Sequence, residues 1–295
     1  MSQTARATTW TVGRLLQWTE QFFADKGIES PRLDAQVLLA HVLGCERIHI
    51  YTRFEEHVEE PQRSQFRDLV RRRVERCPVA YLVGRKEFYR LSFEVTPAVL
   101  IPRPATESLV IRTLEIIKDQ PVPRVLDIGT GSACIAVSIA RQHRGATVTA
   151  VDVSADALLV ARGNAERHRV AERITFILSN TYDGLDGAEC FDVIVSNPPY
   201  IRTDAIAGLA PEVRDHEPLS ALDGGPDGLG VFDRLLAGAA ARLAPGGWLL
   251  VEVGFDQSGD AVRRITATPG LILGPTVQDG DGQPRVVSAR RAEGP

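Results

Sequence analysis

From residue 124 onward, the chain alternates between short apolar runs rich in β-branched residues and segments whose apolar residues recur at helical spacing. The predicted elements are strand 124–128, helix 134–142, strand 147–151, helix 154–168, strands 174–178 and 191–196, helix 230–243, a turn at 244–247, strand 248–253 and helix 257–267. Strands and helices in alternation pair in parallel and form a doubly wound α/β sheet with helices on both faces. Two terminal strands near 271–278 and 285–290 make it seven-stranded.

The first part of the chain has only the helical pattern. Apolar residues at helical spacing predict helices over 11–23, 30–43 and 62–76, which together form a small all-helical domain. One basic run, Arg71-Arg72-Arg73, falls on the third helix. We interpret it as the solvated outer face of that helix, with contact to an RNA-bound or acidic partner as the alternative.

A connection joins these two parts. Residues 87–95 alternate loosely and contain three aromatic residues, which predicts a β-hairpin. The segment Ile101-Pro102-Arg103-Pro104 predicts a stiff extended chain, because each proline disfavours the α region for its predecessor. We therefore predict a helical domain over residues 1–84, a hairpin and proline-rich connection over 85–104, and the α/β domain over 105–295.

The predicted strand 191–196 is followed by Asn197-Pro198-Pro199-Tyr200, a candidate ligand-binding segment. In an open parallel sheet, ligands bind beyond the carboxyl ends of the strands. The prolines hold the carbonyls of Asn197 and Pro198 in nearly fixed directions, and the Asn197 side chain adds an acceptor. A side-chain and a backbone carbonyl could thus grip the two hydrogens of a planar NH2 group, while the Tyr200 ring covers its flat neighbour.

An amide or aromatic amine is a poor nucleophile because its lone pair is conjugated. Two acceptors that fix the NH2 group and favour its pyramidal form would expose the lone pair to an electrophile. The alternative is an ordinary turn that ends a strand, since Asn-Pro is common turn chemistry.

A glycine-containing turn follows the first strand of the α/β domain, in Asp127-Ile128-Gly129-Thr130-Gly131-Ser132-Ala133. Glycines permit a tight turn and close backbone approach to a ligand. Asp152 closes the second strand. Its separation from Gly131 along the sequence is typical of an acidic residue that binds ribose hydroxyls. The pattern predicts a nucleoside ligand at this turn.

A nicotinamide cofactor competes for such a site, but hydride transfer needs no clamp for an NH2 group. S-adenosylmethionine is the nucleoside ligand that explains an NH2-binding segment at Asn197–Tyr200, because its sulfonium methyl group is the electrophile that the NH2 nitrogen would attack. Catalysis would then rest mainly on positioning and desolvation.

Composition excludes several other classes of protein. The four cysteines and six histidines are scattered without paired spacing, so we predict reduced thiols, no metal site and a cytoplasmic protein. No apolar run approaches the roughly 18 residues of a membrane span. Residues 91–295 carry 19 Lys+Arg and 26 Asp+Glu, which argues against stable binding of a long nucleic acid.

The chain resembles the PrmC/HemK family, the N5-glutamine methyltransferases that modify the Gly-Gly-Gln motif of peptide chain release factors. The resemblance covers nearly the whole sequence. The segments that carry it are the helical leader, Pro78-Val79-Ala80-Tyr81-Leu82-Val83-Gly84, Glu87-Phe88, Leu100-Ile101-Pro102-Arg103-Pro104 with Thr106-Glu107, the glycine turn, Asn197–Tyr200 and Glu217-Pro218-Leu219-Ser220-Ala221-Leu222.

This resemblance implies a Rossmann-like class I methyltransferase domain, S-adenosylmethionine as the cofactor and release factors as the protein partner, docked by the helical domain. The implied cofactor-binding residues are Asp127, Gly129, Thr130, Gly131, Ser132, Ala133, Asp152, Asn180, Thr181 and Asn197. The implied catalytic residues are Asn197, Pro198, Pro199 and Tyr200, which also bind the substrate glutamine with Arg103 and Glu107.

Four positions depart from the family pattern. Ala105 stands where an acidic residue usually follows the Ile101–Pro104 segment, and Ala133 replaces the third glycine of the turn. Asn180 and Thr181 stand where an acidic and then often an aromatic residue flank the adenine. Alanine is tolerated at 133 if the position serves helix–strand packing, but is harmful there if φ is positive. Two alternative functions stay open: methylation of a nucleobase amine in DNA or RNA, and non-catalytic binding by a degenerate cofactor site.

Overall fold

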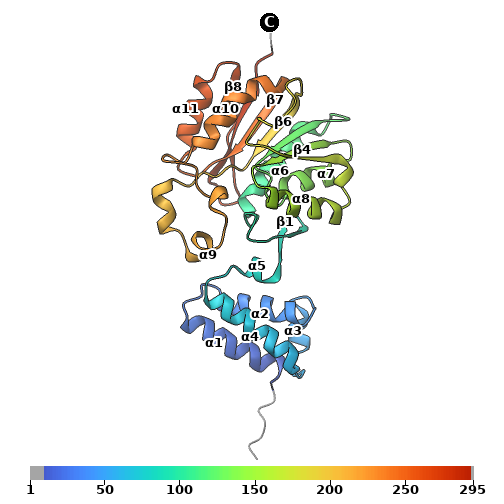
Figure 1. The fold of residues 1–295 in the computed structure, drawn as a ribbon, viewed down its shortest axis with the longest axis vertical. Coiled ribbons are helices and arrows are strands. Elements are labelled where there is room, and N and C mark those ends of the chain that lie inside the picture. The colour runs from blue at the N-terminus through green and yellow to red at the C-terminus, as the bar shows by residue number, and fades with distance from the viewer. Residues whose placement is uncertain (1–9, 294–295) are drawn as a thin grey trace, which may run out of the picture. The chain divides into compact units, whose positions relative to one another are not determined.

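The computed structural model describes residues 10–293 and divides them into two compact units, between Gly84 and Arg85. The first unit is all-helical (Figure 1). Its helices are α1 (Val12–Asp25), α2 (Pro31–Val42), α3 (His49–Thr52), α4 (Glu60–Val74) and α5 (Val79–Val83). The three longer helices lie where the apolar spacing predicts them, whereas α3 and α5 have four and five residues, too few for a periodic pattern.

The basic run on α4 is only partly solvated. Arg73 is buried, and its Nε donates to Oδ2 of Asp34 on α2 at 2.8 Å, whereas Arg71 is exposed. The interpretation of the whole run as an outer face is therefore wrong for Arg73. A guanidinium group enters a helix–helix interface when a carboxylate there pairs with it.

The second unit begins with a β-hairpin of β1 (Arg85–Phe88) and β2 (Leu91–Glu94). Its two-residue turn places Tyr89 and Arg90 at φ values of 46° and 62°, the left-handed conformation that such turns require. The Asn164 side chain of α8 (Ala155–Arg167) accepts from the Glu94 backbone N–H at 2.7 Å and donates to its carbonyl at 3.0 Å. These bonds attach the hairpin to the α/β unit.

The sheet of the second unit has the predicted doubly wound arrangement. Its strand order is β5-β4-β3-β6-β7-β10-β8, with β9 also paired to β10; the first five are parallel, and β10 is antiparallel to its neighbours. The strands are β3 (Arg124–Ile128), β4 (Thr147–Asp152), β5 (Ile174–Leu178), β6 (Phe191–Ser196), β7 (Leu243–Glu252), β8 (Leu271–Leu273), β9 (Val277–Gln278) and β10 (Pro284–Arg291). Strand order reverses between β3 and β6, which is where α/β sheets bind ligands.

Helices cover both faces of this sheet (Figure 1). They are α6 (Glu107–Ile117), α7 (Cys134–Gln142), α8, α10 (Gly230–Arg242) and α11 (Ser258–Ala267), whereas the four-residue α9 (Pro211–Arg214) lies in the loop between β6 and β7 (Figure 1). Alternate residues of β3 show the two faces: Val125 packs with α6, α7 and α8, whereas Leu126 packs with α10 and α11. Because a strand that is buried on both sides has little polar surface, β3 and β6 read as continuous apolar runs.

Two strands differ from the prediction. β7 begins at Leu243 and includes the predicted turn 244–247, because Phe191 and Val193 of β6 face Leu243 and Trp248, so the intervening residues bulge out. The predicted strand near 271–278 is interrupted between β8 and β9, and both pieces pair with β10. Pro275 lies in the gap and cannot donate to the ladder.

Within residues 10–293, none of the helices combines the length and the apolar character needed to cross a bilayer.

Candidate active site

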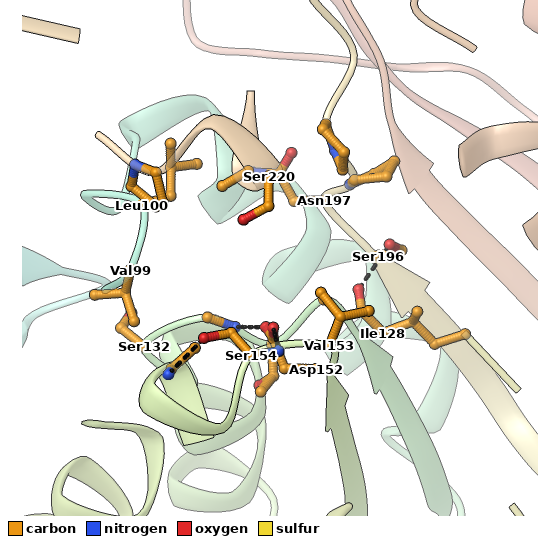
Figure 2. A pocket seen from close by; sticks show the side chains of 18 of the residues that line it. Val99, Leu100, Ile128, Ser132, Asp152, Val153, Ser154, Ser196, Asn197 and Ser220 are labelled. Carbon is orange, nitrogen blue, oxygen red and sulfur yellow. Dashed lines mark hydrogen bonds between the residues drawn. The ribbon is translucent and has the colours of Figure 1, made fainter. Parts of the chain in front are cut away.

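A cavity opens at the carboxyl ends of β3, β4 and β6, at the point where strand order reverses. The structure brings most of the predicted site residues to it. Those lining the cavity are Arg103, Gly129, Thr130, Gly131, Ser132, Asp152, Asn180, Thr181, Asn197, Pro198 and Pro199. Figure 2 shows Asp152 and Ser154 on one side of the cavity and Asn197 and Ser220 across from them.

The turn after β3 is shaped to admit a ligand. Gly129 and Gly131 have φ values of 73° and 53°, and the N–H groups of Gly129 and Thr130 both donate to the Val151 carbonyl, at 2.9 and 3.0 Å. A Cβ atom on either glycine would meet no atom within 4 Å. The backbone therefore faces open space, as close approach of a ligand requires.

Asp152 lies beside this turn. Its Oδ2 accepts from the Gly131 N–H and its Oδ1 from the Ser154 N–H, both at 2.9 Å (Figure 2). Each oxygen of a carboxylate has a second lone pair, so the group is fixed and can still accept from two hydroxyl groups. This donor and acceptor set fits the ribose of a nucleoside.

Asp127 and Ala133 do not line the cavity. Asp127 is buried, and its Oδ2 accepts from the Thr130 hydroxyl at 2.7 Å and from the Ala136 N–H at 3.2 Å, so it holds the turn against the start of α7. Ala133 has a φ of 60°, the strained case for alanine. Both residues act on the shape of the turn and lie behind its ligand-facing surface.

The Asp127 carboxyl group gives a pH-dependent stability. Burial raises its pKa from 3.8 to about 7, so the folded protein binds this proton more tightly than the unfolded chain does. The resulting stability is present below about pH 4 and is lost as the pH rises to about 7. Urea unfolding at several pH values measures this. Between about pH 4 and about pH 7, we expect the free energy of unfolding of wild type to fall by roughly 1 kcal/mol per pH unit relative to that of Asp127→Asn. A difference between the two proteins that does not change with pH would contradict this.

Asn197 is the first residue beyond β6, whose end is anchored by a 2.7 Å bond from the Ser196 hydroxyl to the Ile128 carbonyl. The Asn197 Nδ2 donates to Oγ1 of Thr106 at 3.1 Å. Among residues 10–293, no hydrogen bond reaches its Oδ1. The side chain thus has one fixed donor and an acceptor left for a ligand.

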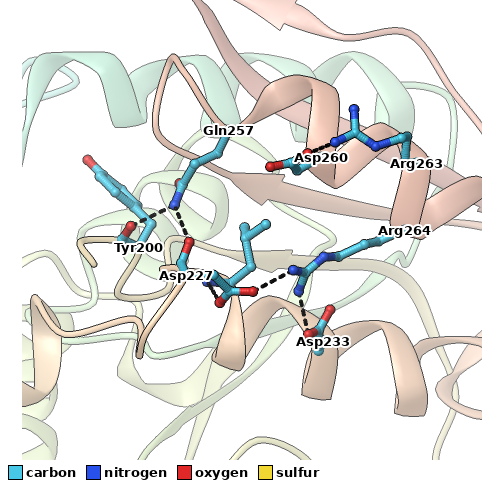
Figure 3. A network of polar contacts seen from close by, with 8 residues as sticks. Tyr200, Asp227, Asp233, Gln257, Asp260, Arg263 and Arg264 are labelled. Carbon is cyan, nitrogen blue, oxygen red and sulfur yellow. Dashed lines mark hydrogen bonds and ion pairs between the residues drawn. The ribbon is translucent and has the colours of Figure 1, made fainter. Parts of the chain in front are cut away.

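Tyr200, a predicted substrate-binding residue, is not among the residues that line the cavity. Its backbone carbonyl accepts from Nε2 of Gln257 at 2.9 Å (Figure 3). Its hydroxyl lies 3.5 Å from Oε1 of Glu252. Gln257 also donates to the Asp227 carbonyl at 3.4 Å, and Arg264 pairs with the Asp227 carboxylate. This network fixes the Pro-Pro-Tyr corner to the loop before α10.

The other two predicted substrate-binding residues have protein partners. Arg103 lines the cavity, and its Nη2 contacts Oε1 of Glu217 at 2.5 Å, while Oε2 of Glu217 accepts from the Ile101 N–H at 3.2 Å. Glu107 accepts from the Tyr89 N–H at 2.9 Å and does not line the cavity, so the structure does not bring it to the predicted substrate site.

Glu217 joins the Ile101–Pro104 connection to the loop that follows β6, and its side chain is only 1% exposed. We expect Glu217→Ala to lower the free energy of unfolding by about 2 kcal/mol, because the partly exposed Arg103 and the Ile101 N–H lose their partner. Urea unfolding measures this. The matched control is Arg214→Ala, which removes an exposed pair with Asp215 and should cost less than about 0.5 kcal/mol. Equal effects of both variants would refute the structural role of Glu217.

Sequence reasoning missed several residues of this region: Val99, Leu100, Thr106, Val153, Ser154, Ser179 and Ser220, which line the cavity, and Glu252 behind it. Glu252 had a signal, since it is the one charged residue inside the apolar strand run 248–253. The others are small or apolar residues whose side chains carry no chemistry that singles them out, although Leu100, Thr106 and Ser220 lie in segments of the family resemblance.

Comparison with known proteins agrees with this arrangement. The PrmC N-terminal domain model matches residues 14–84, and the methyltransferase small domain model matches residues 106–210. The release factor glutamine methyltransferase of Rhodopirellula baltica is 47% identical over 99% of this chain and 100% of its own length. The enzyme of the same name from Geobacter sulfurreducens is 42% identical over 97% of this chain and 99% of its own.

A solved structure adds support for the fold. The crystal structure of a methyltransferase from Pyrococcus furiosus is 22% identical, with a TM-score of 0.51 over 70% of this chain and 92% of that chain. The high identity to curated relatives over almost the full length decides the assignment. The chain belongs to the family of release factor glutamine methyltransferases.

Proposed function

We propose that this protein transfers a methyl group from S-adenosylmethionine to the side-chain amide nitrogen of the glutamine in the Gly-Gly-Gln motif of peptide chain release factors. The observation that carries the proposal is the Asn197 side chain. Its Nδ2 is bound to Thr106, and its Oδ1 is left without a partner among the described residues, in the cavity that the glycine turn and Asp152 also line.

The cofactor, when bound, supplies an activated methyl group on a positively charged sulfur. The residues of the chain supply its position. The open backbone of Gly129 and Gly131 admits the methionine end, Asp152 accepts from the ribose hydroxyls, and Asn180 reaches the adenine.

The substrate amide is held by two acceptors. Oδ1 of Asn197 and the carbonyl of Pro198 accept the two hydrogens of the glutamine NH2 group, and Pro198 and Pro199 keep both acceptors in place. Fixing the NH2 group in this way weakens its conjugation and directs the nitrogen lone pair toward the cofactor side of the cavity. Arg103, held by Glu217, lines the same cavity and is proposed to help bind the substrate.

The helical unit is proposed to dock the release factor, and the protein is proposed to act in the cytoplasm, where that substrate is found. The relatives' names support the choice of a release factor as partner. The net negative charge of residues 91–295 argues against stable binding of nucleic acid.

Mass spectrometry of a purified release factor, after incubation with the protein and S-adenosylmethionine, tests the proposal. We expect the Gly-Gly-Gln peptide to gain the mass of one methyl group. A protein that binds the cofactor and leaves this peptide unmodified would refute it. Methyl transfer to nucleic acid would favour the nucleobase alternative, and calorimetry without cofactor binding at millimolar concentration would favour a degenerate binding protein.

A further inference from the structure

A buried carboxyl group stands directly behind the proposed catalytic asparagine. Glu252 is the last residue of β7 and is 1% exposed. Val251 is the register partner of Ser196 in the neighbouring parallel strand, so Glu252 and Asn197 are the next residues along these two strands. Burial of a carboxyl group destabilises the folded protein unless hydrogen bonds or a charged partner compensate for the loss of water.

Glu252 has few polar contacts. Oε1 lies 3.5 Å from the Tyr200 hydroxyl, a long hydrogen bond, and Oε2 has no well-formed hydrogen bond to any residue in the range 10–293. Burial raises the pKa of the carboxyl group to about 7, and the neighbouring Thr106 hydroxyl, Arg285 and Arg103 lower it. Above this pH the group is a carboxylate, which can only accept hydrogen bonds.

Thr106 contacts Asn197 and is also a neighbour of the Glu252 carboxyl group. It is 2% exposed, and its Oγ1 lies 3.1 Å from Nδ2 of Asn197. A threonine hydroxyl has a single hydrogen to donate. If that hydrogen goes to Glu252, Oγ1 acts as an acceptor toward Asn197, and only the NH2 end of the asparagine amide can face it.

We propose that Thr106 and Glu252 are positioning residues that fix the amide orientation of Asn197, so that Oδ1 faces the substrate; the inference rests on the proposed function. In the flipped orientation, the NH2 group of Asn197 would oppose the NH2 group of the substrate, and neither could accept. The same arrangement selects for a primary carboxamide: a glutamate carboxylate has no hydrogen to give to Oδ1 of Asn197 or to the Pro198 carbonyl.

Thr106→Val and Thr106→Ser test this as a pair at pH 8, where Glu252 is ionised. Valine keeps the shape of threonine and removes the hydroxyl group, and serine keeps the hydroxyl group. For methylation of the release factor, we expect Thr106→Val to lower kcat at least about 30-fold, whereas Thr106→Ser keeps at least about a third of the wild-type kcat. Binding of S-adenosylhomocysteine, measured by calorimetry, should stay within about threefold in both variants, which also reports that they fold.

A second measurement is independent of activity. In nuclear magnetic resonance spectra, the side-chain NH2 hydrogens of Asn197 should exchange slowly with water in wild type and Thr106→Ser, and fast in Thr106→Val. Glu252→Gln, which can still accept from Thr106, should lose less activity than Glu252→Leu. Wild-type kcat in Thr106→Val, or equal losses in Thr106→Val and Thr106→Ser, would overturn the proposal. If wild type itself does not methylate the release factor, the proposed function fails, and the exchange rates alone decide the orientation of Asn197.

Discussion

Asn197→Ala should reduce methyl transfer to the release factor by at least about 10³-fold and leave the affinity for S-adenosylhomocysteine within about tenfold of wild type. The physical reason is the position of the side chain. Nδ2 is held by Thr106, so the acceptor Oδ1 is preorganised for the substrate amide, and the glycine turn and Asp152 supply the cofactor contacts without it. Alanine removes that acceptor and leaves the cofactor contacts in place.

Steady-state kinetics with a release factor substrate, combined with calorimetry, separates these two effects. Asn180→Ala provides the contrast, because Asn180 lines the cavity at the adenine end of the proposed site and Asn197 at the substrate end. It should raise the KM for the cofactor several-fold more than Asn197→Ala does. If Asn197→Ala instead loses cofactor binding as severely as it loses turnover, Asn197 belongs to the cofactor site, and the assignment of the Asn197–Tyr200 corner to substrate is wrong.

The fold of the α/β unit could be predicted from sequence because its strands are buried on both faces. β3 and β6 are short apolar runs with residues packed alternately on opposite helical layers, and such runs are visible without any knowledge of pairing. The turn of the hairpin is harder to predict from the sequence. Tyr89 and Arg90 both adopt positive φ without glycine or asparagine, so the usual turn signal is absent.

The cavity could be located from sequence, but its supports could not. Gly129, Gly131, Asp152 and Asn197 each follow a predictable strand, so the meeting of parallel strand ends brings them together. The contacts that fix them connect residues far apart in the chain: Thr106 to Asn197, and Arg103 to Glu217. No local pattern encodes such pairs, since they depend on the packing of the connection and loops over the sheet.

The predicted role of Asp127 in contacting the cofactor shows the same limit. An acidic residue that ends an apolar strand before a glycine turn is a reasonable ligand contact. Burial decides otherwise: the Asp127 carboxyl group is fully enclosed, and its neighbours are the Thr130 hydroxyl and the Ala136 N–H. Asp152, one strand away, is only partly buried and lies at the cavity.

Asp152→Asn should weaken binding of S-adenosylhomocysteine by about 100-fold, close to 3 kcal/mol, because one of the two acceptor oxygens becomes an NH2 donor and the other loses its charge. The amide keeps the shape of the side chain. However, its Nδ2 must then face either the Gly131 N–H or the Ser154 N–H, each of which needs an acceptor at 2.9 Å. The substitution therefore removes a ligand contact and loosens the turn that admits the ligand.

Calorimetry with S-adenosylhomocysteine measures this effect directly. Asp156→Asn is the matched control, since Asp156 is an exposed residue of the first turn of α8 and does not line the cavity. Its affinity should stay within about twofold of wild type. Burial raises the pKa of Asp152, and its backbone hydrogen bonds oppose that shift, so wild-type affinity should fall as the carboxylate becomes protonated on acidification, whereas that of Asp152→Asn should change less. Wild-type affinity in Asp152→Asn would show that the ribose is held by groups other than Asp152. The asparagine side chain cannot replace the Asp152 carboxylate, because both carboxylate oxygens accept from backbone N–H groups, those of Gly131 and Ser154.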